Sequence, residues 1–350
     1  MRITAFSDDK RILDTSLEQL KLINPKISQE DNKVGSFTFT IYPDHPYYNF
    51  IDKMKSIITV YEEGISEPLF RGRVYDEKTG FYNEKQVSCE GELAFLLDSI
   101  QRPYIFPDKE KGQSGTPAEL FIQYINNHNS QVDETRQFKI GNITVTDPNN
   151  YIVRSNSDYV STWDELNAKL IDHLGGHLWV RHESEGVYID YLADFDVLSN
   201  QMIEFGKNLL DLQKNIKVDG FATALIPLGA KLKDEEGNET GERLTIKSVN
   251  NNVDYVYNAE AVAQYGYIFT TNTWDDVTLA SNLKTKGQTY IDNVAQFAAS
   301  IEVSAADLNG ATIDGEVASV NSFRIGRYVK VNTKPHSIEN QKFILFEKDY

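Results

Sequence analysis

Alternation of apolar and polar residues dominates the first hundred positions of the chain. VGSFTFTIY (34–42) alternates in this way, and MKSIITVYEE, PLFRGRVYDE and KQVSCEGEL follow with polar loops between them. A period of two residues is typical of strands that bury one face. The pattern predicts a small antiparallel β domain over residues 1–100, which ends in a short helical segment, ELAFLLDSI.

Residues 101–200 mix helical and strand patterns, which predicts an α+β domain. PAELFIQYINNHN (117–129) has a proline in its first turn and apolar residues at helical spacing. STWDELNAKLIDHL (161–174) forms a second amphipathic helix, with a capping box from Thr162 to Glu165 and glycines after its end. HLWVRH and YIDYL then alternate on either side of a turn at Glu183 to Gly186, which predicts a hairpin.

Strand character returns in residues 201–248 and 298–350, with a helical insert of residues 249–297 between them. In the insert, NAEAVAQYG has an asparagine start and a glycine stop, and DDVTLASNLKTKGQTYIDNVAQ has apolar residues at helical spacing. Asp275 and Asp276 resemble helix-start charges. SIEVSAADL and RIGRYVKVNTK faintly repeat the pattern of SFTFTIYP and KMKSIITVYEE near the start. The fold class is therefore a multidomain, mainly β, α+β protein, with an internal duplication of the β region as one alternative.

Composition places the chain among ordinary globular proteins. Of its 350 residues, 40% are hydrophobic and 25% charged, and no apolar run approaches the roughly 18 residues that cross a bilayer. The amino terminus lacks the apolar stretch of a signal peptide, so we expect synthesis in the cytoplasm and no membrane insertion. A net charge of −17 argues against the usual basic surface for nucleic acid.

Three of the six histidines, His173, His177 and His182, cluster in sequence and raise the question of a metal site. His173 ends the predicted helix, whereas His177 shares a strand face with Trp179 and Arg181, and His182 points to the other face. A metalloprotease motif needs two histidines on one continuous helix, with a glutamate between them. We therefore predict no metal site here.

Other catalytic patterns are equally incomplete. GQSGT (112–116) lacks the second glycine of a nucleophile elbow and predicts a loop before a helix. KDEEGNETGE (233–242) does not follow the order of a calcium loop and predicts a solvated hairpin tip. The single cysteine, Cys89, lies in a strand pattern and is expected to be buried. The sequence thus predicts no catalytic, cofactor-binding or metal-ligating residue, no cofactor and no enzyme activity.

Several segments together resemble the amino-terminal hub region of the prophage endopeptidase tail family, whose members are also called tail-associated lysins. They are TFTIYPDHPYYNFI, SIITVYEE with PLFRGRV, VSCEGELAFLLDSIQRPY, STWDELNAKLIDHLGGHLWVR with GVYIDYL, and ATALIPLGAKL with YNAEAVAQYGYI and TWDDVTLASNL. The resemblance spans about Val34 to Phe346.

The resemblance implies a virion component at the tail tip, similar to the baseplate hub of contractile-tailed phages. It implies two similar antiparallel β-barrels, at 1–100 and at 201–248 with 298–350, so that a homotrimer imitates six-fold symmetry. The implied partners are the distal tail protein ring, the tail tube, the tape-measure protein and DNA that passes without specific binding. Strands such as SIITVYEE and RYVKVNTK would supply the contacts between protomers.

A second function stays open at this point. The peptidase of such proteins is usually housed beyond the hub, and this chain ends at Tyr350, so no catalytic residue is carried over. The alternative is a cell-wall endopeptidase or glycan-binding module that acts during phage entry. For glycan binding, Tyr47, Tyr48, Tyr151 and Trp179 would supply stacking surfaces.

Overall fold

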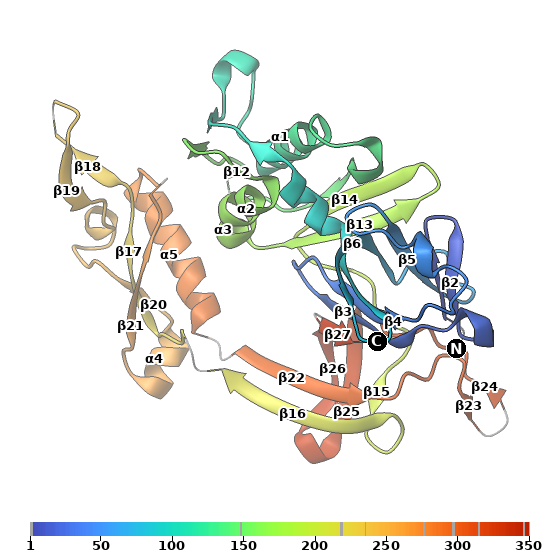
Figure 1. Ribbon diagram of the computed structural model, residues 1–350. Coiled ribbons are helices and arrows are strands. Elements are labelled where there is room, and N and C mark those ends of the chain that lie inside the picture. The colour runs from blue at the N-terminus through green and yellow to red at the C-terminus, as the bar shows by residue number, and fades with distance from the viewer. Residues whose placement is uncertain are drawn as a thin grey trace. The chain divides into compact units, whose positions relative to one another are not determined.

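The computed structural model describes residues 3–147, 149–217, 220–234, 236–275, 277–295, 298–313, 316–345 and 347–349. These residues form two compact units, residues 1–208 with 306–350, and residues 209–305 (Figure 1). Strands exceed helices in both units, which confirms the mainly β, α+β class. The four domain ranges expected from the sequence differ from these units and stay a prediction. Within the described ranges, no helix is long and apolar enough to cross a membrane.

An antiparallel sheet of eight strands is the framework of the first unit. Its order is β2-β1-β5-β6-β7-β4-β3-β27. The strands are β1 (Ile3–Ser7), β2 (Lys10–Asp14), β3 (Ile23–Glu30), β4 (Ser36–Ile41), β5 (Ile57–Glu62), β6 (Phe70–Thr79), β7 (Lys85–Gly91) and β27 (Glu347–Asp349). Phe37, Phe39 and Ile41 alternate inward along β4, as the period of two predicts. The last strand of the chain thus lies at one edge of the first sheet.

The part that follows this sheet packs on its own apolar core. Its helices are α1 (Pro117–Asn129), α2 (Thr162–Leu166), a π-helical turn (Asn167–Ile171) and α3 (Asp172–Leu174), after a 3-10 helix at Glu92–Asp98. Its strands are β8 (Ile100–Gln101), β9 (Tyr104–Phe106), β10 (Lys139–Ile143), β11 (Arg154–Asn156), β12 (Val160–Ser161), β13 (His177–Glu183) and β14 (Gly186–Leu192). The hairpin β13–β14 turns between Glu183 and Gly186, as expected.

The N-cap of the second helix lies one residue earlier than the sequence predicts. Ser161 is the N-cap, and its hydroxyl accepts the amide of Asp164 at 3.0 Å. The Thr162 hydroxyl is buried, where it accepts a hydrogen bond from the Gln101 side chain at 2.8 Å. The tertiary contact of Thr162 therefore removes it from the cap, and the prediction was wrong by one position.

The carboxy-terminal part of the first unit adds two smaller sheets. One holds β15 (Ile203–Glu204), β25 (Tyr328–Thr333) and β26 (Ile338–Ile344), and the other holds β23 (Thr312–Ile313) and β24 (Glu316–Val317). In the three-stranded sheet, β25 lies in the middle, parallel to β15 and antiparallel to β26.

The described part of the second unit contains two two-stranded ribbons, a three-stranded sheet and two α-helices. The elements are β16 (Leu209–Lys217), β17 (Ala224–Leu228), β18 (Lys231–Lys233), β19 (Glu239–Arg243), β20 (Val256–Tyr257), α4 (Ala259–Tyr265), β21 (Phe269–Thr273), α5 (Ala280–Val294) and β22 (Ala298–Ala305). The predicted start and stop of α4 are confirmed, since Asn258 caps it and Gly266 ends it. The helix-start role of Asp275 is wrong, because α5 begins at Ala280 and Asp275 pairs with Arg243 instead. Asp276 lies outside the described residues.

The segments that were expected to form a second barrel lie in several sheets. β15, β25 and β26 form one, β16 pairs with β22 in the other unit, and β27 joins the first sheet. The suggested copies of β4 and β5, namely β22 and β25, are therefore in different units. Two similar barrels are not confirmed.

Candidate functional site: the polar seam around Arg324

Two of the three histidines that were considered as metal ligands, His177 and His182, lie beside different carboxylates. His177 Nδ1 lies 2.7 Å from a carboxylate oxygen of Asp31, in the turn between β3 and β4. His182 Nε2 lies 2.6 Å from Glu92 Oε2, without the alignment of a hydrogen bond. Within the described part of the chain, no three histidine, cysteine or acidic side chains gather in the manner of a metal site. That the protein binds no metal stays a prediction, because the structure carries no test of it.

The remaining sequence candidates are structural elements. Cys89 is buried in β7, and burial raises the pKa of its thiol well above the usual value. Residues 112–116 form the expected loop, which ends in Thr116, the N-cap of α1. Strands β18 and β19 flank residues 234–238, so the hairpin predicted around the acidic stretch is confirmed.

A serine and a histidine meet in a way that the sequence does not reveal. Ser99 Oγ lies 2.8 Å from His128 Nδ1, while His128 Nε2 donates to the carbonyl of Arg136 at 3.0 Å. The carbonyl can only accept, so Nε2 carries the proton and Nδ1 accepts from Ser99. Both side chains are buried. A nucleophile must reach its substrate, and this pair therefore serves packing, not acyl transfer.

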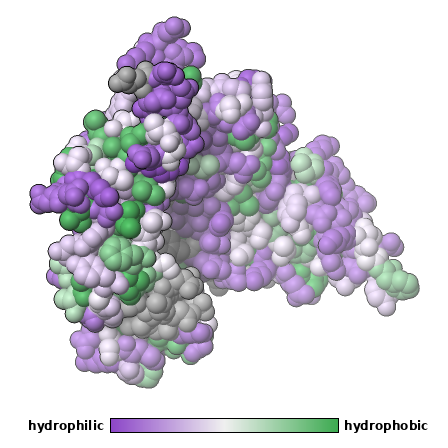
Figure 2. Space-filling model, turned by 90° about the vertical axis from the view of Figure 1, so that its left-hand side faces the viewer, coloured by the Kyte–Doolittle hydropathy of each residue, from purple (hydrophilic) through white to green (hydrophobic). Residues whose placement is uncertain are grey.

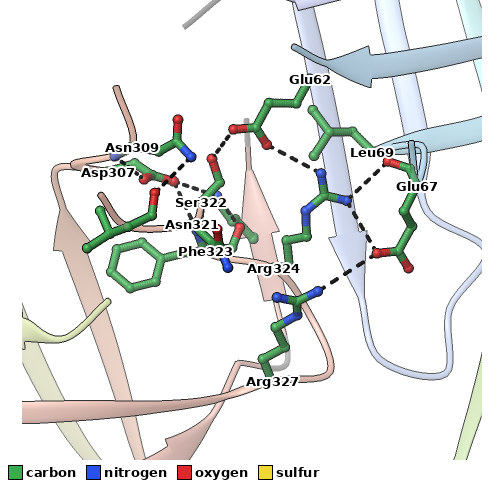
Figure 3. A network of polar contacts seen from close by, with 12 residues as sticks. Glu62, Glu67, Leu69, Asp307, Asn309, Asn321, Ser322, Phe323, Arg324 and Arg327 are labelled. Atoms are coloured by element: carbon green, nitrogen blue, oxygen red, sulfur yellow. Dashed lines mark hydrogen bonds and ion pairs between the residues drawn. The ribbon is translucent and has the colours of Figure 1, made fainter. Parts of the chain in front are cut away.

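A network of polar contacts joins the first sheet to the carboxy-terminal segment, and we name it the polar seam (Figure 3). Its members are Glu62, Glu67, Asp307, Ser322, Arg324, Arg327 and Lys348. Arg324 Nη2 lies 3.3 Å from Glu62 Oε2, and the Ser322 hydroxyl donates to the other oxygen of the same carboxylate. Only 9% of the Arg324 side chain and 1% of the Glu62 side chain are exposed. A buried carboxylate is thus neutralised by partners about 260 residues away.

The second half of the seam surrounds Asp307. Its carboxylate accepts the amide of Phe323 at 3.0 Å and the side-chain amide of Gln201 at 2.9 Å. Lys348 Nζ lies 3.4 Å from Asp307 and donates to the Phe323 carbonyl at 2.6 Å. Burial lowers the pKa of Lys348, although Asp307 acts against it. The pKa of Asp307 also lies below its usual value, because the hydrogen bonds from Gln201 and the backbone outweigh the effect of burial.

A cavity of about 140 Å³ lies between this seam and the β13–β14 hairpin. Its lining includes four carboxylates, Glu30, Asp31, Glu67 and Glu92, and four basic side chains, Lys33, Arg71, Arg324 and Arg327. Arg71 pairs with Glu92, and Arg327 Nη2 lies 3.8 Å from Glu67. Because the opposite charges balance, the cavity offers no excess charge to an ionic ligand. The arrangement holds distant segments together and does not show the chemistry of an active site.

The partners in these ion pairs and hydrogen bonds could not be predicted from the sequence, because they are far apart along the chain. Asp31 and His177 are 146 positions apart, and Arg324 and Glu62 are 262 apart.

The aromatic residues that were considered for glycan stacking are mostly covered. Tyr47 and Tyr48 are partly buried and pack on the core of the large sheet. Tyr151 is exposed, whereas Trp179 packs its ring on Phe195. Further exposed aromatic residues lie in both units, and those of the 209–305 unit include Tyr257, Tyr267 and Phe269.

Comparison with known proteins identifies one matching family and several similar solved structures. Residues 198–350 match the family model described as Prophage endopeptidase tail. No curated protein matches the chain by sequence.

Solved structures match along the whole chain. The 43 kDa tail protein of prophage MuSo2 from Shewanella oneidensis is 14% identical, with a TM-score of 0.62 over 100% of this chain and 94% of its own. The tail protein from Neisseria meningitidis is 12% identical, with a TM-score of 0.58 over 99% of this chain and 91% of its own. Prophage tail protein gp18 from Listeria monocytogenes is 13% identical, with a TM-score of 0.54 over 100% of this chain and 90% of its own.

At these identities the structural likeness establishes the fold, and the family match covers the carboxy-terminal part. The resemblance predicted from the sequence is thereby confirmed: residues 198–350 match the prophage endopeptidase tail family, and the whole chain has the fold of prophage tail proteins.

Proposed function

We propose that this protein is a structural component of a phage tail tip, a hub that joins the six-fold tail tube to a three-fold tip. The observation that carries the proposal is the likeness to the MuSo2 tail protein, which extends over the full length of this chain. The polar seam supports the proposal, because its paired charges link the first sheet to the carboxy-terminal segment, as expected in a protein with a structural role.

The hub is proposed to be a homotrimer in the assembled tail, with two barrel-like regions from each protomer around the channel. The expected contact strands need revision. β5 lies between β1 and β6, and β25 lies between β15 and β26, so neither has a free edge for pairing. In the large sheet, the described edge strands are β2 and β27, and we assign the edge contacts between protomers to these strands.

The proposed partners are the distal tail protein ring, the tail tube and the tape-measure protein, with DNA passing through the channel. Affinity for duplex DNA grows with each phosphate that a basic group neutralises. A chain of net charge −17 suits a conduit that must release DNA. Asp and Glu are therefore expected along the trimer axis.

Electron microscopy of the intact tail tip tests this proposal. Three copies of the chain in one ring around the channel, with acidic residues toward the axis, would support it. A six-copy ring would contradict the trimer, and a location away from the tip would overturn the hub function itself.

The proposed role is not catalytic, although the family description contains the word endopeptidase. The alternative is a cell-wall hydrolase. A zymogram on bacterial cell walls distinguishes the two, because clearing by the purified chain would establish the hydrolase and contradict a purely structural role.

A further inference from the structure

The three-stranded sheet of the 209–305 unit has two different faces. Its order is β20-β17-β21, and helix α5 covers one face. Gly287 allows this close approach, because a Cβ there would lie 3.1 Å from Pro227 on the central strand. Leu225 lies under the same helix, beside Leu283 and Ile291. Since side chains alternate along a strand, Ala224, Ile226 and Leu228 belong to the opposite face.

Aromatic residues occupy that opposite face. Ala224 is in register with Tyr257 on β20 and with Phe269 on β21. Tyr255 and Tyr267 lie just before these two strands, and their rings contact those of Tyr257 and Phe269, so all four share one face. We call the four aromatic residues, Tyr255, Tyr257, Tyr267 and Phe269, the aromatic patch. The small side chain of Ala224 leaves room for rings from both flanking strands to meet above the central strand.

The rings of the patch contact one another and remain open to solvent. Tyr267 and Phe269 stack with centroids 5.8 Å apart, and Tyr255 meets Phe269 edge-on at 5.2 Å. Tyr257 meets Tyr267 at 5.7 Å. Tyr257 is 44% exposed, and Tyr267 and Phe269 are each 51% exposed. Figure 2 shows the face of the molecule that lies on the left-hand side of Figure 1, where hydrophobic residues reach the surface beside paler ones.

The area of the patch decides what kind of ligand fits it. Three rings about half exposed, together with the less exposed Tyr255, present at most on the order of 400 Å². A stable protein interface needs roughly 800 Å² from each partner, about twice as much. The patch is therefore small for a protein partner, but it matches an oligosaccharide of two or three sugar rings.

The chemistry of the patch also suits sugars. A sugar ring has an apolar face of C–H groups and a rim of hydroxyls, and the patch offers aromatic faces with three phenol hydroxyls among them. Desolvation and the neighbouring Tyr255 and Tyr257 raise the pKa of Tyr267, so its phenol is neutral and able to donate. Asp254, the residue before Tyr255, pairs with Lys247 at 3.6 Å, so this neighbouring charge is balanced. We propose that the aromatic patch is a binding site for neutral glycans.

Titration with soluble oligosaccharides tests the proposal on the full-length chain. The probes are cellotriose, maltotriose and chitotriose, and binding is followed by isothermal titration calorimetry. We expect saturable binding of at least one probe with a dissociation constant of about 1 mM, because two or three stacked rings are the main source of affinity. Tyr257→Ala with Phe269→Ala should weaken this binding at least tenfold.

Control variants make the result specific. Tyr257→Phe keeps the ring and should retain most of the binding, whereas Phe81→Ala removes a 91% exposed ring from a hairpin tip in the other unit and should change nothing. Circular dichroism and thermal unfolding confirm that each variant is folded. No saturable binding of any probe overturns the proposal, and so does equal binding by the Tyr257→Ala/Phe269→Ala variant. If that variant binds no less sugar but fails to assemble into tails, the patch is a protein interface.

Discussion

Removal of Arg324 from the polar seam should destabilise the first unit more than removal of its neighbour Arg327. Arg324→Met leaves the Glu62 carboxylate, which is 1% exposed, without its cationic partner. Arg327→Met removes a pair that is 28% and 36% exposed and 3.8 Å long. The two substitutions are chemically identical and lie three residues apart, so they form a matched pair.

The size of the effect follows from the geometry. At 3.3 Å and an effective dielectric constant of about 20, the attraction between the two charges is about 5 kcal/mol. Breaking a buried pair from one side costs about 3–5 kcal/mol in measured cases. Since Ser322 still donates to Glu62, we expect Arg324→Met to lower the free energy of unfolding by about 3 kcal/mol, the low end of this range. An exposed ion pair contributes at most about 1 kcal/mol, so Arg327→Met should lower the free energy of unfolding by no more than this.

Urea unfolding followed by tryptophan fluorescence measures the difference. The chain has three tryptophans. Trp163 and Trp179 report on the first unit and Trp274 on the second, so a Trp274→Phe background isolates the first transition. Hydrogen exchange at β27 gives a second, local readout, because Lys348 belongs to the same seam. Two results would refute the reasoning: an equal loss of unfolding free energy in the two variants, or a loss below about 1 kcal/mol for Arg324→Met.

Four further outcomes are expected. Burial lowers the pKa of His128 below 6.5, so its stabilising contribution is complete above pH 6.5 and falls as the pH drops toward the folded-state pKa, because the unfolded chain binds the proton first. His128→Gln should flatten this dependence in urea unfolding at pH 5 to 7.5, and unchanged slopes would contradict it. Thr116→Ala should cost about 1 kcal/mol through loss of the α1 cap, measured by the same unfolding, and a change below about 0.2 kcal/mol would argue against the cap. Cys89 should react with a thiol reagent only on unfolding, and labelling of the folded protein would disprove its burial. Replacement of residues 209–305 by a short glycine-serine linker should leave the first unit folded, and loss of its cooperative unfolding would show that the second unit is required.

Local signals account for the elements that the sequence predicts well. Helix α4 begins and ends where Asn258 and Gly266 stand, because a cap and a left-handed glycine act within one turn. The turn of the β13–β14 hairpin follows from alternation and a glycine in the same way. The 161–174 helix was predicted as an element, but its first residue was wrong, because Thr162 is held by the distant Gln101.

The candidate site could not be predicted because its residues meet only in the folded chain. Neither the pair of Asp31 with His177 nor that of Glu62 with Arg324 has a spacing that a motif could capture. The aromatic patch is an intermediate case. Tyr255, Tyr257, Tyr267 and Phe269 alternate in two short segments, but which face α5 covers is decided by packing. Exposure of these rings is a property of tertiary structure, not of the pattern.

The sequence pattern predicts boundaries after residues 200, 248 and 297, whereas the two units meet after residues 208 and 305. β16 begins at Leu209, directly after a turn at residues 205–208, and β22 ends at Ala305, so both boundaries coincide with strand ends. The two ends are joined within the first unit, since the amide of Ala306 donates to the Asn208 carbonyl at 2.8 Å. Residues 209–305 are thus inserted between neighbouring positions, and an insertion of this kind requires no change in the surrounding strands. Contacts such as the hydrogen bond from Gln201 to Asp307 hold together the two segments of the first unit, which are about a hundred residues apart in the sequence.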